Sequence, residues 1–188
     1  MNIFVLDENP YHAAQMLCDK HAAGKMVVES AQMLSTAHRV LDGKLVIQNR
    51  NGRNMKHYDL FEGNDDLEAE QMYYRATHIN HPCNVWVRES DANYEWLWEH
   101  FYALCDEYTY RYGRTHKSSN LLYPLRSKPI NIPIGKLTPF ALGMKSTNPE
   151  CMNEDDPVGS YRAFYQTKQD KFKMVWTKRQ KPEWFKVK

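Results

Sequence analysis

The chain has 188 residues, of which 42% are apolar, and a net charge of only +2 at neutral pH. This is enough apolar material for one substantial core, so a single domain over residues 1–188 is expected. With so small a net charge, no overall electrostatic field forces a nucleic-acid or membrane role, and no apolar run approaches the ~20 residues of a membrane helix.

The cysteines indicate a reducing compartment. Cys18, Cys83, Cys105 and Cys151 lie far apart and form no CxxC pair, and no secretory signal is visible. Such cysteines are typical of reduced, mostly buried thiols. We therefore expect a cytoplasmic protein, in the host cell if a phage encodes it, with neither a membrane nor an obligatory protein partner.

Two helices are predicted near the N-terminus. Asn9 followed by a proline is a helix start, and the first helix should cover residues 10–22. Gly24 weakens a helix by about 1 kcal/mol relative to alanine, so a kink or break is expected there. The second helix should cover residues 25–41 and end at Asp42-Gly43.

The second helix is amphipathic. Its inward positions are apolar, whereas a set of polar side chains shares the opposite face, which favours simple solvation of that face. The polar set is Lys25, Glu29, Gln32, Thr36 and Arg39.

A β-hairpin is predicted near residues 44–60, because two strand-like runs flank Asn51-Gly52, the typical pair of a type I′ turn. The acidic stretch 62–70 should form a solvated loop. His78 and His81 could ligate a metal, but no cysteine or carboxylate completes a recognised site. No metal and no cofactor are therefore predicted.

The centre of the stretch 81–117 predicts one long helix with two neighbouring stripes. The apolar stripe contains Tyr94, Leu97, Trp98, Phe101, Leu104, Cys105, Tyr108 and Tyr112, and the polar one contains Asn93, His100, Glu107 and Arg111. Polar side chains beside a core-facing stripe either form a buried hydrogen-bonded network or line a cleft. Both alternatives remain open from the sequence.

The last third of the chain divides into two parts. Residues 121–150 contain five prolines and should form an extended segment that wraps the helical core of residues 1–120 through its leucines, isoleucines and phenylalanine. Residues 151–188 should form a helix, opened by Asp156-Pro157, and a basic aromatic tail. The fold class expected is therefore mainly α, a compact helical domain with a small hairpin and an extended proline-rich segment.

The tail has two interpretations. Between Lys168 and Lys188 there are eight lysines or arginines against two acids, interleaved with Phe172, Trp176, Trp184 and Phe185. Cations and rings together suit a nucleic-acid strand, since the cations contact phosphates and the rings stack on bases. Alternatively, the rings dock on the core.

The order of motifs resembles a family of small phage proteins, with blocks CDKH, ESAQML, NHP, WVRES and YRYG at residues 18–21, 29–34, 80–82, 86–90 and 110–113. The HP block followed by a helix with an aromatic, glycine-containing end also resembles, more distantly, the pyrimidine-dimer DNA glycosylases of the endonuclease V type. This second resemblance covers about the first 120 residues.

The glycosylase resemblance implies a compact helical repair protein that breaks the N-glycosidic bond of damaged pyrimidines and then cuts the abasic site. A carboxylate stabilises the positive charge that develops on the sugar, and an amine attacks the sugar carbon. In the family this amine is the free N-terminus. Asn2 is too bulky for removal of the initiator methionine to be expected, so the amine here would be that of Met1, with Lys25 as the alternative.

The candidate residues follow from these roles. Glu29 is the first choice for the carboxylate and Glu107 the second, with Lys25 and His21 as further catalytic candidates. DNA contacts are expected from His81, Asn93, Arg111, Arg114, His116, Lys117, Lys178 and Arg179. The predicted function is a phage-type DNA-processing enzyme, a glycosylase or abasic-site lyase acting on damaged or modified pyrimidines. The alternative is a nucleic-acid-binding or host-takeover protein without catalysis.

Overall fold

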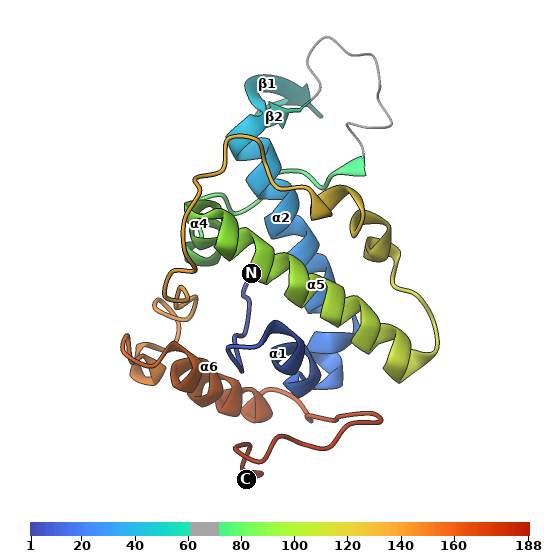
Figure 1. Ribbon diagram of the computed structural model, residues 1–188, viewed down its shortest axis with the longest axis vertical. Helices are drawn as coiled ribbons and strands as arrows, with labels where there is room; N and C mark the ends of the chain where they lie inside the picture. The colour runs from blue at the N-terminus through green and yellow to red at the C-terminus, as the bar shows by residue number, and fades with distance from the viewer. Residues whose placement is uncertain (61–71) are drawn as a thin grey trace.

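The computed structural model describes residues 1–60 and 72–188 (Figure 1). Helices dominate it, and a two-stranded antiparallel hairpin stands at one end, which confirms the mainly α fold class. The acidic stretch 62–70, predicted as a solvated loop, lies outside the described residues.

The first helix is shorter than expected. Helix α1 covers Pro10–Met16, and its cap Asn9 accepts hydrogen bonds from the backbone of Tyr11 and His12. The helix ends because Leu17 is extended and buried, and the next amide, that of Cys18, donates to the Tyr165 hydroxyl 2.9 Å away. A tertiary contact therefore ends α1 before residue 22.

The predicted kink at Gly24 is present. A π-helical turn over His21–Lys25 contains Gly24 at φ 164° and ψ −43°, outside helical geometry. Helix α2 then covers Met26–Asp42 and is capped by Gly43. The kink changes the direction of the chain immediately before Lys25, at the start of α2.

The polar face of α2 is not uniformly solvated, contrary to the sequence prediction. Thr36 and Arg39 are buried. The Arg39 guanidinium donates to the carbonyls of Tyr74, Tyr58 and Tyr73 at 2.7, 2.7 and 3.1 Å. Arg39 thus fastens the hairpin and residues 73–74 to α2, and its charge is satisfied by backbone oxygens.

The hairpin has the predicted geometry. Strand β1 (Lys44–Arg50) pairs antiparallel with β2 (Arg53–Asp59). Asn51 and Gly52 both have positive φ, at 49° and 77°, as a type I′ turn requires.

The long helix predicted at the centre of residues 81–117 is present, and a separate short helix precedes it. Helix α4 covers Pro82–Glu89 and α5 covers Asp91–Tyr112. Between them, Ser90 is extended, its hydroxyl accepts from the Asn93 amide, and it donates to the Lys136 carbonyl. Helix α5 packs on α1, α2 and α4 and ends at Gly113, which has a left-handed conformation with φ 67°.

Residues 121–150 wrap the domain without a long helix, as predicted, with only short 3-10 turns at Pro124–Arg126 and Pro149–Cys151. Their isoleucines are not all inward, however. Ile130 and Ile134 are 91% and 93% exposed, contrary to the prediction. The backbone holds the segment instead, because the Asp42 carboxylate accepts from the amides of Ile130 and Asn131.

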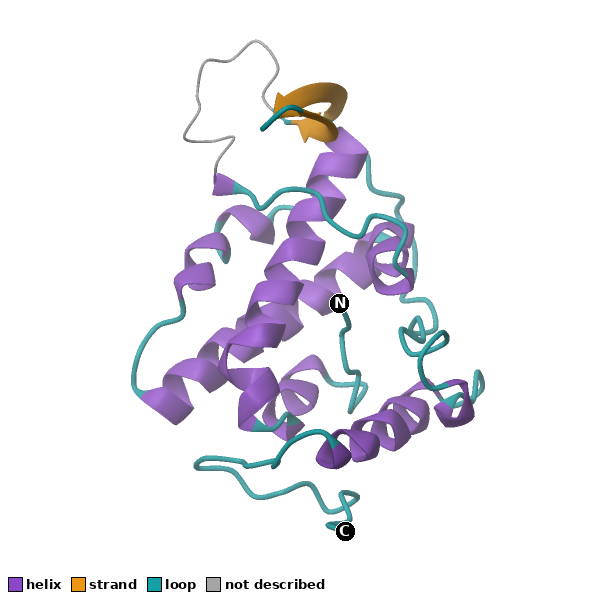
Figure 2. Ribbon diagram, turned by 180° about the vertical axis from the view of Figure 1, so that it is seen from behind, coloured by secondary structure: helices purple, strands orange, loops and turns teal. Residues whose placement is uncertain are grey.

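Helix α6 covers Pro157–Gln166 and is capped by Asp156, as expected. The chain then runs along the lower side of the domain, beneath α6 and α1 (Figures 1 and 2). Phe185 is buried, and the Trp176 indole donates to the Met16 carbonyl at 2.8 Å. Of the two interpretations of the tail, the structure favours docking on the core for these rings.

Candidate functional site

The polar stripe of α5 does not line a common cleft. Asn93 is fully buried: its amide donates to the Trp86 carbonyl and the Thr138 hydroxyl, both at 2.8 Å. His100, also fully buried, bonds through Nδ1 to the Pro10 carbonyl at 2.9 Å. These side chains tie neighbouring segments to α5, so the prediction that Asn93 contacts DNA is not supported by its position.

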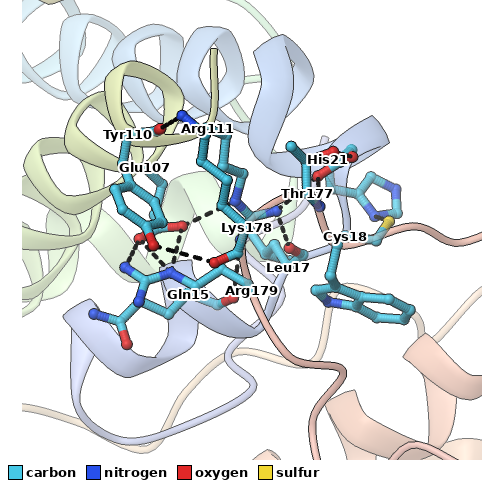
Figure 3. A network of polar contacts seen from close by, with 12 residues as sticks. Gln15, Leu17, Cys18, His21, Glu107, Tyr110, Arg111, Thr177, Lys178 and Arg179 are labelled. Carbon is cyan, nitrogen blue, oxygen red and sulfur yellow. Dashed lines mark hydrogen bonds and ion pairs between the residues drawn. The ribbon is translucent and has the colours of Figure 1, made fainter. Parts of the chain in front are cut away.

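The other end of the stripe forms a closed ionic cluster (Figure 3). We call Asp19, Glu107, Arg111 and Arg179 the latch. Arg111 Nε donates to Glu107 Oε2 at 2.9 Å, and Arg179, from the tail, donates to both carboxylate oxygens of Glu107. Arg111 also donates to Asp19 at 3.1 Å.

The latch joins three parts of the chain. Arg111 Nη1 and Nη2 donate to the carbonyls of Leu17 and Gln15 at 2.7 and 2.9 Å, and Asp19 accepts from the amide and hydroxyl of Thr177. Both Glu107 and Arg111 are buried. Because their polar atoms already have partners, the latch holds the tail against α1 and α5 and does not present a catalytic carboxylate or a free phosphate contact.

His21 is also inside the core. Its Nδ1 lies 2.8 Å from the Tyr165 hydroxyl, and its ring lies 4.7 Å from that of Phe4. Burial, with the nearby charges of Lys25 and Lys168, lowers the pKa of His21 to about 4. His21 is therefore neutral at neutral pH and supports the surrounding packing, and it is not placed as an accessible acid or base.

The remaining candidates for DNA contact lie on the surface around the end of α5. Arg114 and Lys117 are exposed, and Lys178 donates to the Tyr110 carbonyl at 2.8 Å. His116 accepts from the Ser118 amide through Nδ1, and a Cβ built on Gly24 would lie 3.9 Å from its Nε2. The turn at residues 114–117 thus adjoins the kink that precedes Lys25.

Three predicted residues meet elsewhere, in a cavity of about 290 Å³ that we call the amine pocket. Lys25 and Glu29 reach it from the start of α2, and His81 reaches it from the start of α4. The full lining is Met1, Asn2, Phe4, Lys25, Glu29, His81, Gly143, Ser146, Thr147, Asn148, Phe164, Lys168 and Lys171. The volume is close to the lower end of the ~300–1,000 Å³ typical of ligand pockets.

Glu29 lies among amines in this pocket. Its Oε2 accepts from the Asn2 backbone amide at 2.9 Å, and its Oε1 lies 3.8 Å from Lys25 Nζ and 3.9 Å from the α-amine of Met1. The side chain keeps 14% of its surface exposed. A carboxylate held by a backbone bond and still open to the pocket can stabilise positive charge that develops on a bound molecule.

His81 supplies a neutral donor. It caps α4 by accepting from the Cys83 amide at Nδ1, at 3.2 Å, so the neutral ring carries its proton on Nε2. Burial, and then the charge of the Met1 amine, lower the pKa of His81. The imidazole is therefore suited to donate one hydrogen bond into the pocket.

Sequence reasoning missed Lys168 and Lys171 as pocket residues, because it assigned them only to the basic tail. Lys168 Nζ lies 3.6 Å from the centroid of the Phe164 ring. Burial, followed by the charges of Lys171 and Lys25, lowers the pKa of Lys168 to about 8. The spacing of four residues puts Phe164 and Lys168 on one side of the chain where α6 ends, but this spacing does not show what that side packs against.

The pocket is cationic. Amines from Met1, Lys25, Lys168 and Lys171 line it, and Glu29 is the one carboxylate among its described lining residues. This charge favours an anionic ligand and disfavours a metal cation. Residues 1–60 and 72–188 contain no group of three histidine, cysteine or acidic side chains arranged to hold a metal.

Neither a family model nor a curated protein nor a solved structure matches this chain. Its assignment therefore depends on the geometry of the amine pocket and on the motifs of the sequence. Among the helices of the described ranges, none has the length and apolar character needed to cross a membrane.

Proposed function

We propose that this chain is a DNA-processing enzyme that cleaves the N-glycosidic bond of damaged or modified pyrimidines and reacts with the abasic site through an amine. One observation carries the proposal: a carboxylate, Glu29, faces several amines in a single open pocket. These are the two kinds of group that the chemistry requires.

The roles follow from the positions. Cleavage of a glycosidic bond develops positive charge on the deoxyribose, which the Glu29 carboxylate stabilises. Attack on the sugar carbon needs an unprotonated amine, which the pocket lysines supply. His81 donates to an oxygen of the bound nucleotide, and the exposed cations of Lys25 and Lys171 contact the flanking phosphates.

Access to a base inside a duplex requires that the nucleotide turn out of the stack. Arg114 and Lys117 are exposed on the turn beside Gly24, next to the helix start that carries Lys25. In the proposal they hold the DNA backbone while the nucleotide enters the amine pocket. Their removal weakens binding to all sequences alike, because phosphate contacts carry no sequence information.

The test is a nicking and trapping assay. Wild-type protein is incubated with ultraviolet-irradiated, hypermodified, abasic and undamaged duplexes, with borohydride added to reduce any imine to a stable covalent adduct. We expect adducts on a damaged or abasic duplex and none on the undamaged one. Glu29→Gln should slow base release by about 10²–10³-fold, the usual effect of removing one electrostatic stabiliser.

Glu183→Gln is the matched control, because Glu183 is exposed and does not line the amine pocket. It should react like the wild type. Absence of nicking and of any adduct on every damaged, hypermodified or abasic substrate would refute the glycosylase and lyase activity.

The second candidate is nucleic-acid binding without catalysis, and the excess of amines over carboxylates in the pocket favours it. In that case Glu29→Gln leaves nucleic-acid binding unchanged. The affinity for nucleic acid then falls steeply as the salt concentration rises, because binding releases counterions. Deletion of residues 168–188 does not test it cleanly, because Phe185 and Trp176 belong to the packing of the core. Reversal of exposed charges at Arg114 and Lys117 is the better test.

A further inference from the structure

The amines of the pocket differ in their surroundings. Lys168 Nζ lies over two rings, 3.6 Å from the centroid of Phe164 and 5.8 Å from that of Phe4. Lys25, by contrast, has 56% of its side chain exposed and lies 3.8 Å from the Glu29 carboxylate. Aromatic carbon thus replaces water on one side of the Lys168 amine, and no carboxylate of residues 1–60 or 72–188 forms an ion pair with it.

The charges near Lys168 lower the pKa of its amine, as burial does. Desolvation, Lys171 and Lys25 together lower the pKa of Lys168 to about 8, so about a tenth of the amine is unprotonated at pH 7 and about half at pH 8. The Phe164 ring attracts the ammonium form and opposes this effect. An amine attacks carbon only in its unprotonated form.

We propose that Lys168 is a carbonyl-reactive amine that forms a Schiff base with an aldehyde bearing phosphate groups. The inference rests on the proposed function, because an abasic site in DNA is such an aldehyde. The selection for phosphate comes from Lys25 and Lys171, which line the same pocket and supply fixed positive charge beside the amine. Ser146 and Thr147 add hydroxyl groups at the rim.

The chemistry balances without a further reactant. The nitrogen lone pair of Lys168 forms a bond to the aldehyde carbon, the carbonyl electron pair moves to oxygen, and a proton passes from nitrogen to that oxygen. The resulting carbinolamine takes up one proton from solvent and loses its hydroxyl as water, which leaves a protonated imine. Borohydride delivers hydride to the imine carbon and gives a stable secondary amine.

The test uses pyridoxal 5′-phosphate as the probe, followed by borohydride and peptide mass spectrometry of the intact chain after digestion. We expect the main label on Lys168. Lys168→Arg keeps the positive charge and removes the nucleophile, so labelling at this position disappears and the total falls by about tenfold. Pyridoxal, which lacks the phosphate, should label Lys168 about tenfold more slowly.

Lys173→Arg is the matched control, since Lys173 is exposed and lies outside the amine pocket; its labelling should equal that of the wild type. Circular dichroism and the urea midpoint establish that Lys168→Arg is folded. Label spread evenly over the exposed lysines, or equal labelling of Lys168→Arg and wild type, would overturn the inference.

The abasic-DNA arm separates this inference from the proposed function. If pyridoxal 5′-phosphate labels Lys168 but no DNA adduct forms, the proposed function is refuted and the reactivity of Lys168 is supported. A DNA adduct mapped to Lys25 or to the α-amine of Met1, and retained in Lys168→Arg, supports the proposed function and refutes the role of Lys168.

Discussion

Glu107 in the latch and Glu29 in the amine pocket both face cations, but their surroundings differ. Glu107 is 5% exposed and accepts from two guanidinium groups, which fill both of its oxygens. Glu29 is 14% exposed, accepts one backbone amide, and has its amines at 3.8 and 3.9 Å. Both oxygens of Glu107 therefore accept hydrogen bonds from arginine, whereas Oε1 of Glu29 has only the longer ionic contacts with the two amines.

The difference shows why a polar stripe on a helix is a poor guide to a site by itself. The guanidinium group of an arginine can donate two parallel hydrogen bonds to a carboxylate. A carboxylate that accepts from two arginines is therefore held in one position. Lysine amines act as point charges and need not lie within hydrogen-bond distance. The open carboxylate is therefore the better candidate for chemistry, and the closed one for stability.

Among these variants, the largest loss of stability is expected when the latch is broken. Glu107→Gln removes the buried carboxylate that pairs with Arg111 and leaves that guanidinium with Asp19 as its carboxylate partner, and loss of one member of a buried ion pair destabilises a protein by about 3–5 kcal/mol. Urea denaturation measures the free energy of unfolding. Glu183→Gln, at an exposed position, should change it by less than about 0.5 kcal/mol. Equal stability of the two variants would contradict the role of the latch.

The next effect on stability depends on pH, because burial lowers the pKa of His21 and of His100 in the core. The pKa of His21 and that of His100 are each lowered from 6.5 to about 4, chiefly by burial. In the unfolded chain both groups take up a proton near pH 6.5, whereas in the folded protein they resist it. Their contribution is therefore present above pH 6.5 and is lost as pH falls toward 4, up to about 3 kcal/mol for each.

Urea midpoints between pH 7 and pH 4 test this directly. Other groups also titrate in acid, so the comparison is with His100→Gln, in which part of the pH dependence should disappear. A slope in the variant equal to that of the wild type would show that His100 contributes nothing to the acid sensitivity.

Local features of the fold were predictable, since they depend on short stretches of sequence. The break at Gly24, the turn at Asn51-Gly52 and the cap at Asp156 each follow from the preferences of residues next to one another. The end of α1 and the burial of Arg39 were not predictable in this way. Both depend on partners far along the chain, Tyr165 in one case and Tyr58, Tyr73 and Tyr74 in the other.

The same limit applies to the candidate site. Lys25 and Glu29 share one helical face and His81 caps α4, and the structure brings these three candidates to one cavity. Lys168 could not be placed, because its position depends on how α6 packs against Phe4 and the N-terminus. Helical periodicity also cannot distinguish a carboxylate that is fully hydrogen-bonded from one that keeps an oxygen free of hydrogen bonds. For this reason Glu107 was the second candidate for the catalytic carboxylate, after Glu29.

A smaller effect should follow from releasing the tail alone. In Arg179→Gln the Glu107 carboxylate keeps its bond to Arg111 but loses the partner from the tail, and hydrogen bonds to charged groups contribute about 1.5–3 kcal/mol. Because Arg179 is partly exposed, we expect the lower end of that range. Limited proteolysis should then cut within residues 170–188 faster than in the wild type.

Lys181→Gln is the control for this variant, since Lys181 is an exposed cation of the same tail. It should be cut at the wild-type rate. Faster cleavage in both variants would show that loss of positive charge, and not loss of the latch contact, loosens the tail.

The smallest change in stability should come from Glu29→Gln, the counterpart of Glu107→Gln in the open pocket. The amide oxygen of glutamine still accepts from the Asn2 backbone, and the amines left behind remain within reach of solvent in the pocket. The free energy of unfolding should therefore change by less than about 1 kcal/mol. Because residues placed for chemistry are often neutral or unfavourable for stability, such a small effect is typical of a functional carboxylate. If Glu29→Gln instead unfolds as easily as Glu107→Gln, Glu29 is a structural ion-pair partner, and the distinction between the two carboxylates fails.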